Sequence, residues 1–69
     1  NISAANLALS EREIEILSLV AAGCTNQKIS EKLSISLETV KSHIFRIKAR
    51  LNAADRTEAA VIAVRAKLV

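Results

Sequence analysis

The fold of this 69-residue chain follows from the stretch SLETVKSHIFRIKARL, residues 36–51. At about 100° per residue, its large aliphatic side chains fall on one stripe, and we expect them in the core. These side chains are Leu37, Val40, Ile44, Ile47 and Leu51. Ser36 is a favoured N-cap residue, and Asn52 tolerates the left-handed conformation in which helices often end. The stretch therefore predicts a long amphipathic helix over residues 37–51.

A helix over residues 11–22 is predicted closer to the N-terminus. Ser10 and Glu13 form a capping box, in which each side chain bonds the backbone N–H of the other residue. We also expect Glu13 to meet a basic partner on the helix over residues 37–51. Gly23 ends the first helix, because glycine adopts a left-handed conformation without steric cost. The expected inner face comprises Ile14, Leu17 and either Val20 or Ala21, with Cys24 folded back into the core.

A short helix is predicted directly before the long one. Thr25 or Asn26 can cap a helix over residues 26–33, and residues 34–36 form the turn that follows it. A short helix, a tight turn and a long amphipathic helix are the parts of a helix-turn-helix.

A last helix, opened by Asp55 or Arg56, is predicted over residues 56–68. The expected fold class is therefore all-α, a four-helix helix-turn-helix domain over residues 9–69. Residues 1–8 carry no periodic pattern and are predicted to be a linker tail.

Composition limits the class of protein. One aromatic residue, a single glycine and no proline favour helices over strands, and 69 residues fit one domain. Cys24 is the only cysteine, which excludes an internal disulfide and a zinc site built from several cysteines. The sequence contains no long apolar run and no signal-peptide pattern, so we expect no membrane contact and a cytoplasmic protein.

The sequence shows no catalytic constellation. His43 is the only histidine and has no second ligand or positioned carboxylate nearby, and no glycine-rich phosphate loop or nucleophile elbow is present. We therefore expect no enzyme activity, no metal and no cofactor, and a surface or phosphate-proximal position for His43.

Charge is distributed unevenly along the chain, whose formal net charge is +3. Residues 10–22 carry a net −2, from Glu11, Arg12, Glu13 and Glu15. Residues 41–56 carry a net +4, from Lys41, Arg46, Lys48, Arg50, Asp55 and Arg56. A basic end is typical of a nucleic-acid footprint, although an ordinary solvated surface explains the charges equally well.

Side chains on the helix over residues 37–51 suit the chemistry of DNA. Lys41 can donate to guanine N7 and O6, Glu38 can accept from cytosine N4, and Ser42 is small enough for close approach. Phosphate contacts are expected from Thr39, Arg46, Lys48 and Arg50, and from the backbone N–H groups at the helix starts near Asn26 and Thr57.

Four segments lie in a familiar order and spacing: LSEREIEIL (residues 9–17), GCTNQKI (23–29), SLETVKSH (36–43) and RTEAA (56–60). Together they resemble the LuxR/FixJ-type (GerE-like) DNA-binding domains of bacterial transcription regulators over residues 9–68. The resemblance implies the output domain of such a regulator, often a response regulator, which binds a pseudo-palindromic operator as a homodimer. It also implies RNA polymerase as a partner, and a receiver or ligand-binding domain before this one.

The resemblance further implies roles for individual positions. Those that face bases are Glu38, Lys41, Ser42 and Phe45. Those that lie near phosphates are Thr25, Asn26, Thr39, Arg46, Arg56 and Thr57. The fourth helix would form the dimer contact through Ala60, Ala63 and Val64; its apolar run over residues 59–64 permits this, although a helix that is simply well buried would show the same run.

Five positions depart from the family pattern, of which Ser30 and Asn52 are tolerable replacements for the usual alanine and glycine. Lys28 removes the usual capping box of the second helix, and Ser34 replaces a frequent turn glycine. Phe45 stands where a polar or basic residue is common, and it would either touch a thymine methyl group or pack beside the turn.

Two other functions fit the same fold. A protein-interaction module would show exposed apolar groups where this chain has Lys41, Ser42, Arg46 and Lys48. A sigma-factor promoter-recognition region has a similar helix-turn-helix, but the RTEAA segment and the apolar helix after it argue against that class.

Overall fold

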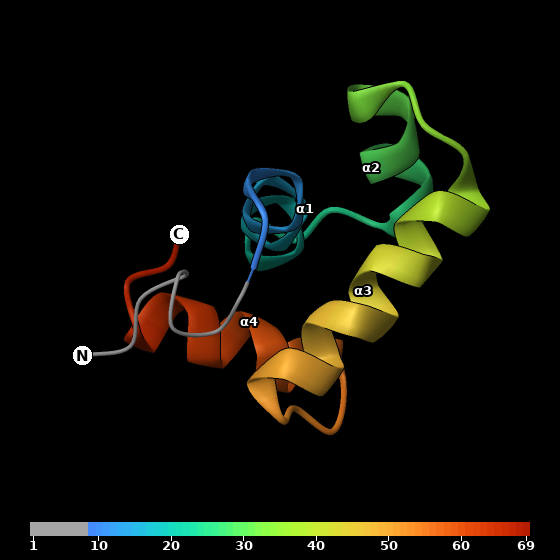
Figure 1. Ribbon diagram of the computed structural model, residues 1–69. Helices are drawn as coiled ribbons and strands as arrows, with labels where there is room; N and C mark the ends of the chain where they lie inside the picture. The colour runs from blue at the N-terminus through green and yellow to red at the C-terminus, as the bar shows by residue number, and fades with distance from the viewer. Residues whose placement is uncertain (1–8) are drawn as a thin grey trace.

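The computed structural model describes residues 9–69, which form four α-helices and no strands (Figure 1). The helices are α1 (Glu11–Ala21), α2 (Asn26–Leu33), α3 (Leu37–Leu51) and α4 (Arg56–Arg65). This confirms the predicted all-α fold class. The linker tail predicted over residues 1–8 lies outside the described residues.

The predicted capping box begins α1. The Ser10 hydroxyl accepts from the Glu13 backbone N–H at 3.1 Å, and the Glu13 carboxylate accepts from the Ser10 N–H at 3.0 Å. At the other end Gly23 takes a φ of 91°, and the Cys24 N–H donates to the Leu19 carbonyl at 3.0 Å. This is a Schellman termination, which turns Cys24 back toward the core.

Left-handed residues also end the other helices. Ser34 ends α2 and Asn52 ends α3, each with a φ of 55°. The prediction for the last helix was wrong at its C-terminal end, because α4 stops at Arg65 rather than at residue 68. Lys67 takes a φ of 57°, and the Leu68 N–H donates to the Ala63 carbonyl, so the chain folds back and Leu68 packs on the core.

All four helices contribute to one apolar core. Its fully buried members include Ile16 and Leu17 of α1, Ile29 of α2, Val40 and Ile47 of α3, and Ala59 and Ala63 of α4. The expected stripe of α3 is buried except for Leu37, which is half-buried at the first turn. In α1 the buried isoleucine is Ile16, and the predicted Ile14 lies at the margin of the core.

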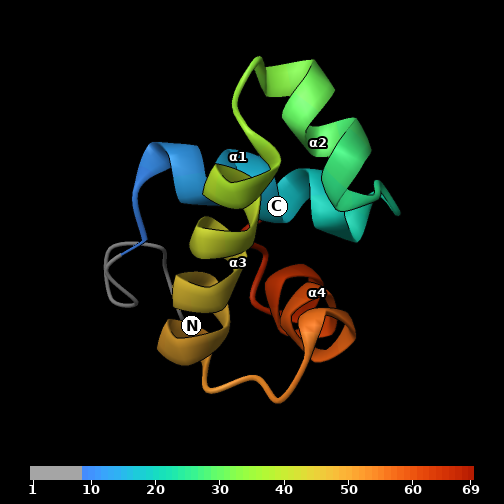
Figure 2. The same cartoon turned by 90° about the vertical axis from the view of Figure 1, so that its right-hand side faces the viewer.

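The arrangement leaves one side of α3 uncovered. Helices α1 and α4 both pack against α3 and against each other, while α2 packs mainly on the N-terminal half of α3 (Figure 1). In Figure 2, α3 runs down the front of the molecule with α1 behind it. None of the helices in residues 9–69 combines the length and apolar composition that a membrane crossing requires.

Candidate nucleic-acid interface

The outward face of α3 carries the four side chains predicted to meet bases. Glu38, Lys41, Ser42 and Phe45 are all exposed. Their spacing of three, four and seven residues places them on one stripe of the helix, opposite the buried stripe that holds Ile47. The same core contacts that fix the rotation of α3 therefore present these four residues together. We call this stripe the reading face.

Two charged residues of the reading face interact with each other. The Lys41 ammonium lies 3.5 Å from the Glu38 carboxylate, and both side chains are more than half exposed. Ion pairs of this kind on a helix surface contribute little to stability and exchange readily for other partners. Lys41 can therefore leave Glu38 for a base without disturbing the fold.

Phe45 projects into solvent at the C-terminal end of the reading face. Its side chain is 72% exposed, and it makes no part of the hydrophobic core. The alternative that Phe45 packs beside the turn is therefore wrong. The core stripe has no room for it, because Val40, Ile44 and Ile47 already fill the inner side of α3.

The flanks of the reading face carry the phosphate candidates of α3. Arg46 is exposed on one flank and Lys48 is half-buried on the other. Within residues 9–69, no carboxylate lies within ion-pair distance of either residue. Thr39 sits at the start of α3, where its hydroxyl lies 2.8 Å from that of the N-cap residue Ser36. Two cations therefore border the reading face with their charge uncompensated.

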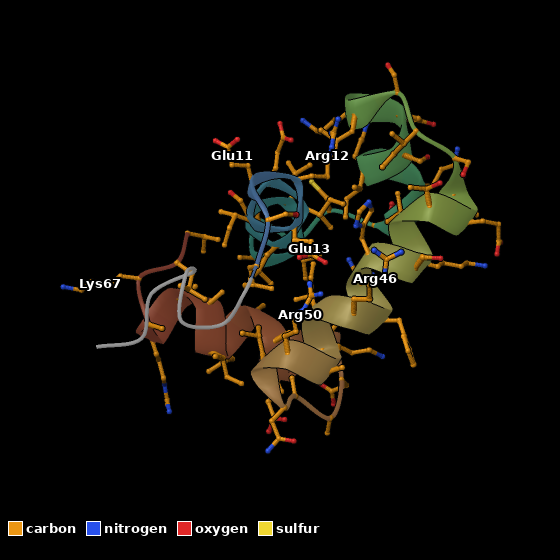
Figure 3. All side chains as sticks on the ribbon, in the orientation of Figure 1. Glu11, Arg12, Glu13, Arg46, Arg50 and Lys67 are labelled. Atoms are coloured by element: carbon orange, nitrogen blue, oxygen red, sulfur yellow. The ribbon has the colours of Figure 1, made fainter. Side chains whose placement is uncertain are left out.

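Arg50 does not join these cations. Its guanidinium donates to the Glu13 carboxylate at 2.6 Å, and Figure 3 shows the two side chains pointing toward each other from α3 and α1. Glu13 is 3% exposed, so it requires a cationic partner. The expectation of a basic partner for Glu13 is confirmed. The assignment of Arg50 to a phosphate is not supported, because the ion pair directs it into the protein.

Arg56 likewise forms an internal tie, in this case between α4 and the start of α2. Its guanidinium donates to the Asn26 side-chain oxygen and, at 2.7 Å, to the Cys24 carbonyl. This contact holds together two segments predicted to lie near phosphate. It also uses the Asn26 oxygen and part of the guanidinium, so both residues act first as scaffold. Sequence reasoning missed this tie, since 30 residues separate its partners.

The amino ends of α2 and α4 differ in charge. Thr25 caps α2 by accepting from the Lys28 N–H at 3.1 Å, which confirms Thr25 as the cap. Asp55 caps α4 by accepting from the Glu58 N–H at 2.8 Å, and Glu58 accepts from the Ala54 N–H. Two carboxylates beside Thr57 repel phosphate, so α2 offers the better anion-binding end.

Helix α4 shows a small apolar surface next to α1. Val61 and Val64 are 43% and 58% exposed, and with Ala21, Ala60 and Arg65 they line a shallow hollow. Ala63 is fully buried against the core, which removes it from any contact with a second copy. The predicted dimer residues Ala60 and Val64 remain at the surface. We call this hollow the α4 patch.

His43 and Cys24, the residues considered as metal ligands, belong neither to the reading face nor to the α4 patch. His43 is half-buried on α3, and its Nδ1 atom has no hydrogen-bond partner within the described residues. Cys24 is half-buried and forms no disulfide within the described residues. No group of three potential metal ligands occurs in residues 9–69.

Helices α2 and α3, joined by a short turn, form a helix-turn-helix whose second helix presents polar and cationic side chains, an arrangement typical of DNA-binding domains. The family described as "Bacterial regulatory proteins, luxR family" matches residues 7–63 of the chain. The chain belongs to this family and is the DNA-binding domain of a transcription regulator.

Curated relatives support the assignment. Over 61 residues, the transcriptional regulatory protein LiaR of Bacillus subtilis (strain 168) is 52% identical. The response regulator protein VraR of Staphylococcus aureus (strain Mu3 / ATCC 700698) is 43% identical over the same length. Each alignment covers 88% of this chain and 29% of the relative. The chain thus spans under a third of the length of these curated relatives.

Proposed function

We propose that this domain recognises a specific double-stranded DNA site by placing α3 in the major groove. The reading face is the observation that supports this placement of α3. Four side chains of mixed chemistry share one exposed stripe of a 15-residue helix, with uncompensated cations on both flanks. An α-helix fits the major groove, where each base pair presents a distinct pattern of donors and acceptors.

Within the groove, Lys41 donates to guanine and Glu38 accepts from cytosine N4, while Ser42 allows close approach. In the unbound domain Glu38 and Lys41 satisfy each other at 3.5 Å. Binding replaces this weak pair by two base contacts of opposite polarity, which a neighbouring cytosine and guanine supply. The recognised half-site therefore contains at least one G·C pair.

The phosphate contacts come from a smaller set than the sequence predicts. Arg46, Lys48 and Thr39 border the reading face, and Thr25 stands at the amino end of α2. Arg50, Arg56 and Asn26 hold the scaffold together. Thr57 is exposed, but it lies beside Asp55 and Glu58, so its contribution is the smallest.

Two copies of the domain bind together on a pseudo-palindromic site, with the α4 patch as their contact. Val61, Val64 and Ala60 supply its apolar surface. Two half-sites about one helical turn apart match a two-fold protein dimer.

Specific binding is tested by selecting preferred duplexes from a random pool and measuring fluorescence anisotropy at several salt concentrations. We expect the selected duplex to bind on the order of 10³-fold more tightly than a random one. Both affinities should fall with salt, and Arg46→Ala should reduce the slope on both by about one unit. Equal affinity for the selected and random duplexes would reject sequence recognition.

The dimer is tested by comparing duplexes that carry one or two half-sites. The second half-site should raise the affinity of the unaltered chain, and Val64→Glu should remove that gain. Val69→Glu is the matched control, because Val69 is also exposed but does not line the α4 patch. If both variants keep the gain in affinity from the second half-site, α4 does not form the interface.

The relatives are named as transcriptional regulatory and response regulator proteins, and three further proposals follow from these names. The full-length protein carries a sensory or receiver domain that controls this one, it acts on chromosomal DNA in the cytoplasm, and it contacts RNA polymerase. A pull-down of polymerase by the full-length protein on its selected site tests the last proposal; no enrichment over a random duplex would contradict it.

A further inference from the structure

Phe45 is the one large apolar side chain on the reading face, and its surroundings define what it can bind. It lies one turn after Lys41 and one turn before Ala49, between the cationic flanks that hold Arg46 and Lys48. Its ring is 72% exposed, whereas every other large hydrophobic residue of α3 is buried or half-buried. The partner of this ring must therefore offer a small apolar group that is flanked by negative charges.

We propose that Phe45 reads the 5-methyl group of a thymine, and so makes thymine a required base of the half-site. This inference rests on the proposed placement of α3 in the major groove. The thymine methyl is the only methyl group that a base pair presents there, and phosphates border it on both sides. The isolated ring and its cationic flanks complement that arrangement.

The helix geometry places this thymine relative to the guanine read by Lys41. Four residues separate Phe45 from Lys41, which corresponds to about 6 Å along the helix axis. Base pairs on one strand are about 3.4 Å apart, so the methyl group and the guanine lie within about two base-pair steps of each other. Arg, Lys or Ser at position 45 would read a polar base edge instead, so Phe45 changes the sequence preference of the domain.

Because Phe45 is exposed, its role in DNA binding can be tested without destabilising the fold. Because Phe45 is largely exposed and is not a member of the hydrophobic core, Phe45→Ala and Phe45→Ser should leave the melting temperature of the domain nearly unchanged. Any effect of these variants on DNA binding then reports the lost contact and not a damaged helix.

The test replaces thymine by uracil in the selected duplex, which removes only the methyl groups. The unaltered chain should bind the uracil duplex about fourfold more weakly for each half-site, the equilibrium equivalent of burying one methyl group. Phe45→Ala should bind both duplexes with equal affinity. Lys41→Ala is the matched control. It removes the contact with guanine and not the contact with thymine, so it should keep the preference for thymine.

The outcomes distinguish this proposal from the proposed function. If the unaltered chain prefers its selected site over random DNA but binds the thymine and uracil duplexes equally, the reading of thymine by Phe45 is overturned and specific binding stands. The same holds if Phe45→Ala keeps the thymine preference. If the unaltered chain binds no duplex, both proposals fail, and the exposed ring belongs to a protein contact.

Discussion

Helices α3 and α4 differ in the side chains that they bury and expose. In α3 the buried positions hold large aliphatic residues such as Ile47, and most exposed positions are polar or charged. In α4 the buried positions hold Ala59 and Ala63, and the exposed ones include Val61 and Val64. The fully buried positions of α4 thus hold small residues, while its two valines remain exposed and Ile62 packs on the edge of the core. The two outward faces therefore suit different partners: DNA for α3 and a protein surface for α4.

The strongest contrast within α4 is between neighbouring residues. Ala63→Glu would place a carboxylate in the core and should cost several kcal/mol, enough to unfold much of a small domain. Val64→Glu adds the same charge to an exposed position and should leave the fold intact. Thermal unfolding followed by circular dichroism distinguishes the two. Equal melting temperatures would contradict the inward orientation of Ala63.

Substitution of two arginines of α3 should show that one contributes to stability and the other to DNA binding. Arg50→Ala removes the partner of the buried Glu13 carboxylate and should lower the free energy of unfolding by about 2–3 kcal/mol, below the cost of breaking a fully buried pair because Arg50 is 40% exposed. It should leave the salt dependence of DNA binding unchanged. Arg46→Ala is the matched control. It should leave the free energy of unfolding nearly unchanged and reduce the salt dependence of DNA binding. A lower salt slope for Arg50→Ala would return Arg50 to the phosphate contacts.

Lys41→Ala tests the reading face itself. Lys41 is exposed and pairs only weakly with Glu38, so the fold should be unaffected. Loss of a guanine contact should weaken binding to the selected duplex by about 2 kcal/mol, within the usual range for one good base contact. Anisotropy with the selected and random duplexes measures this. An equal loss on both would show that Lys41 contacts only phosphate.

The smallest expected effect is a gain in stability at the turn before α3. Ser34 holds a left-handed conformation, with a φ of 55°, that is unfavourable for a residue with a Cβ atom. Ser34→Gly should therefore raise the free energy of unfolding by about 1 kcal/mol and leave DNA affinity unchanged. Asn52→Gly should gain less, since asparagine tolerates this conformation better. Chemical denaturation measures both; a loss of stability in Ser34→Gly would contradict this explanation.

Local signals in the sequence predicted most of the fold. The capping box at Ser10 and Glu13, the caps at Thr25 and Ser36, and the left-handed ends at Gly23 and Asn52 depend on residues only a few positions apart. The apolar period of α3 was equally informative, because one rotation of the helix buries nearly all of its large aliphatic residues and exposes the reading face.

The remaining features depend on packing between distant segments. Residues 59–64 are apolar on every side, so their sequence could not show that Ala63 faces inward and Val64 outward. Arg50 and Arg56 look like other surface cations until Glu13 and Asn26 are placed beside them. The roles of these residues follow from contacts that no local pattern records.

An NMR titration of the ¹⁵N-labelled domain with its selected duplex tests directly whether the outward face of α3 meets DNA. We expect the largest amide shifts on residues 38–46 and at the start of α2 near Thr25, with the outer surface of α1 around Glu11 and Glu15 unaffected. The largest shifts on α1, with residues 38–46 unchanged, would contradict a contact between α3 and DNA.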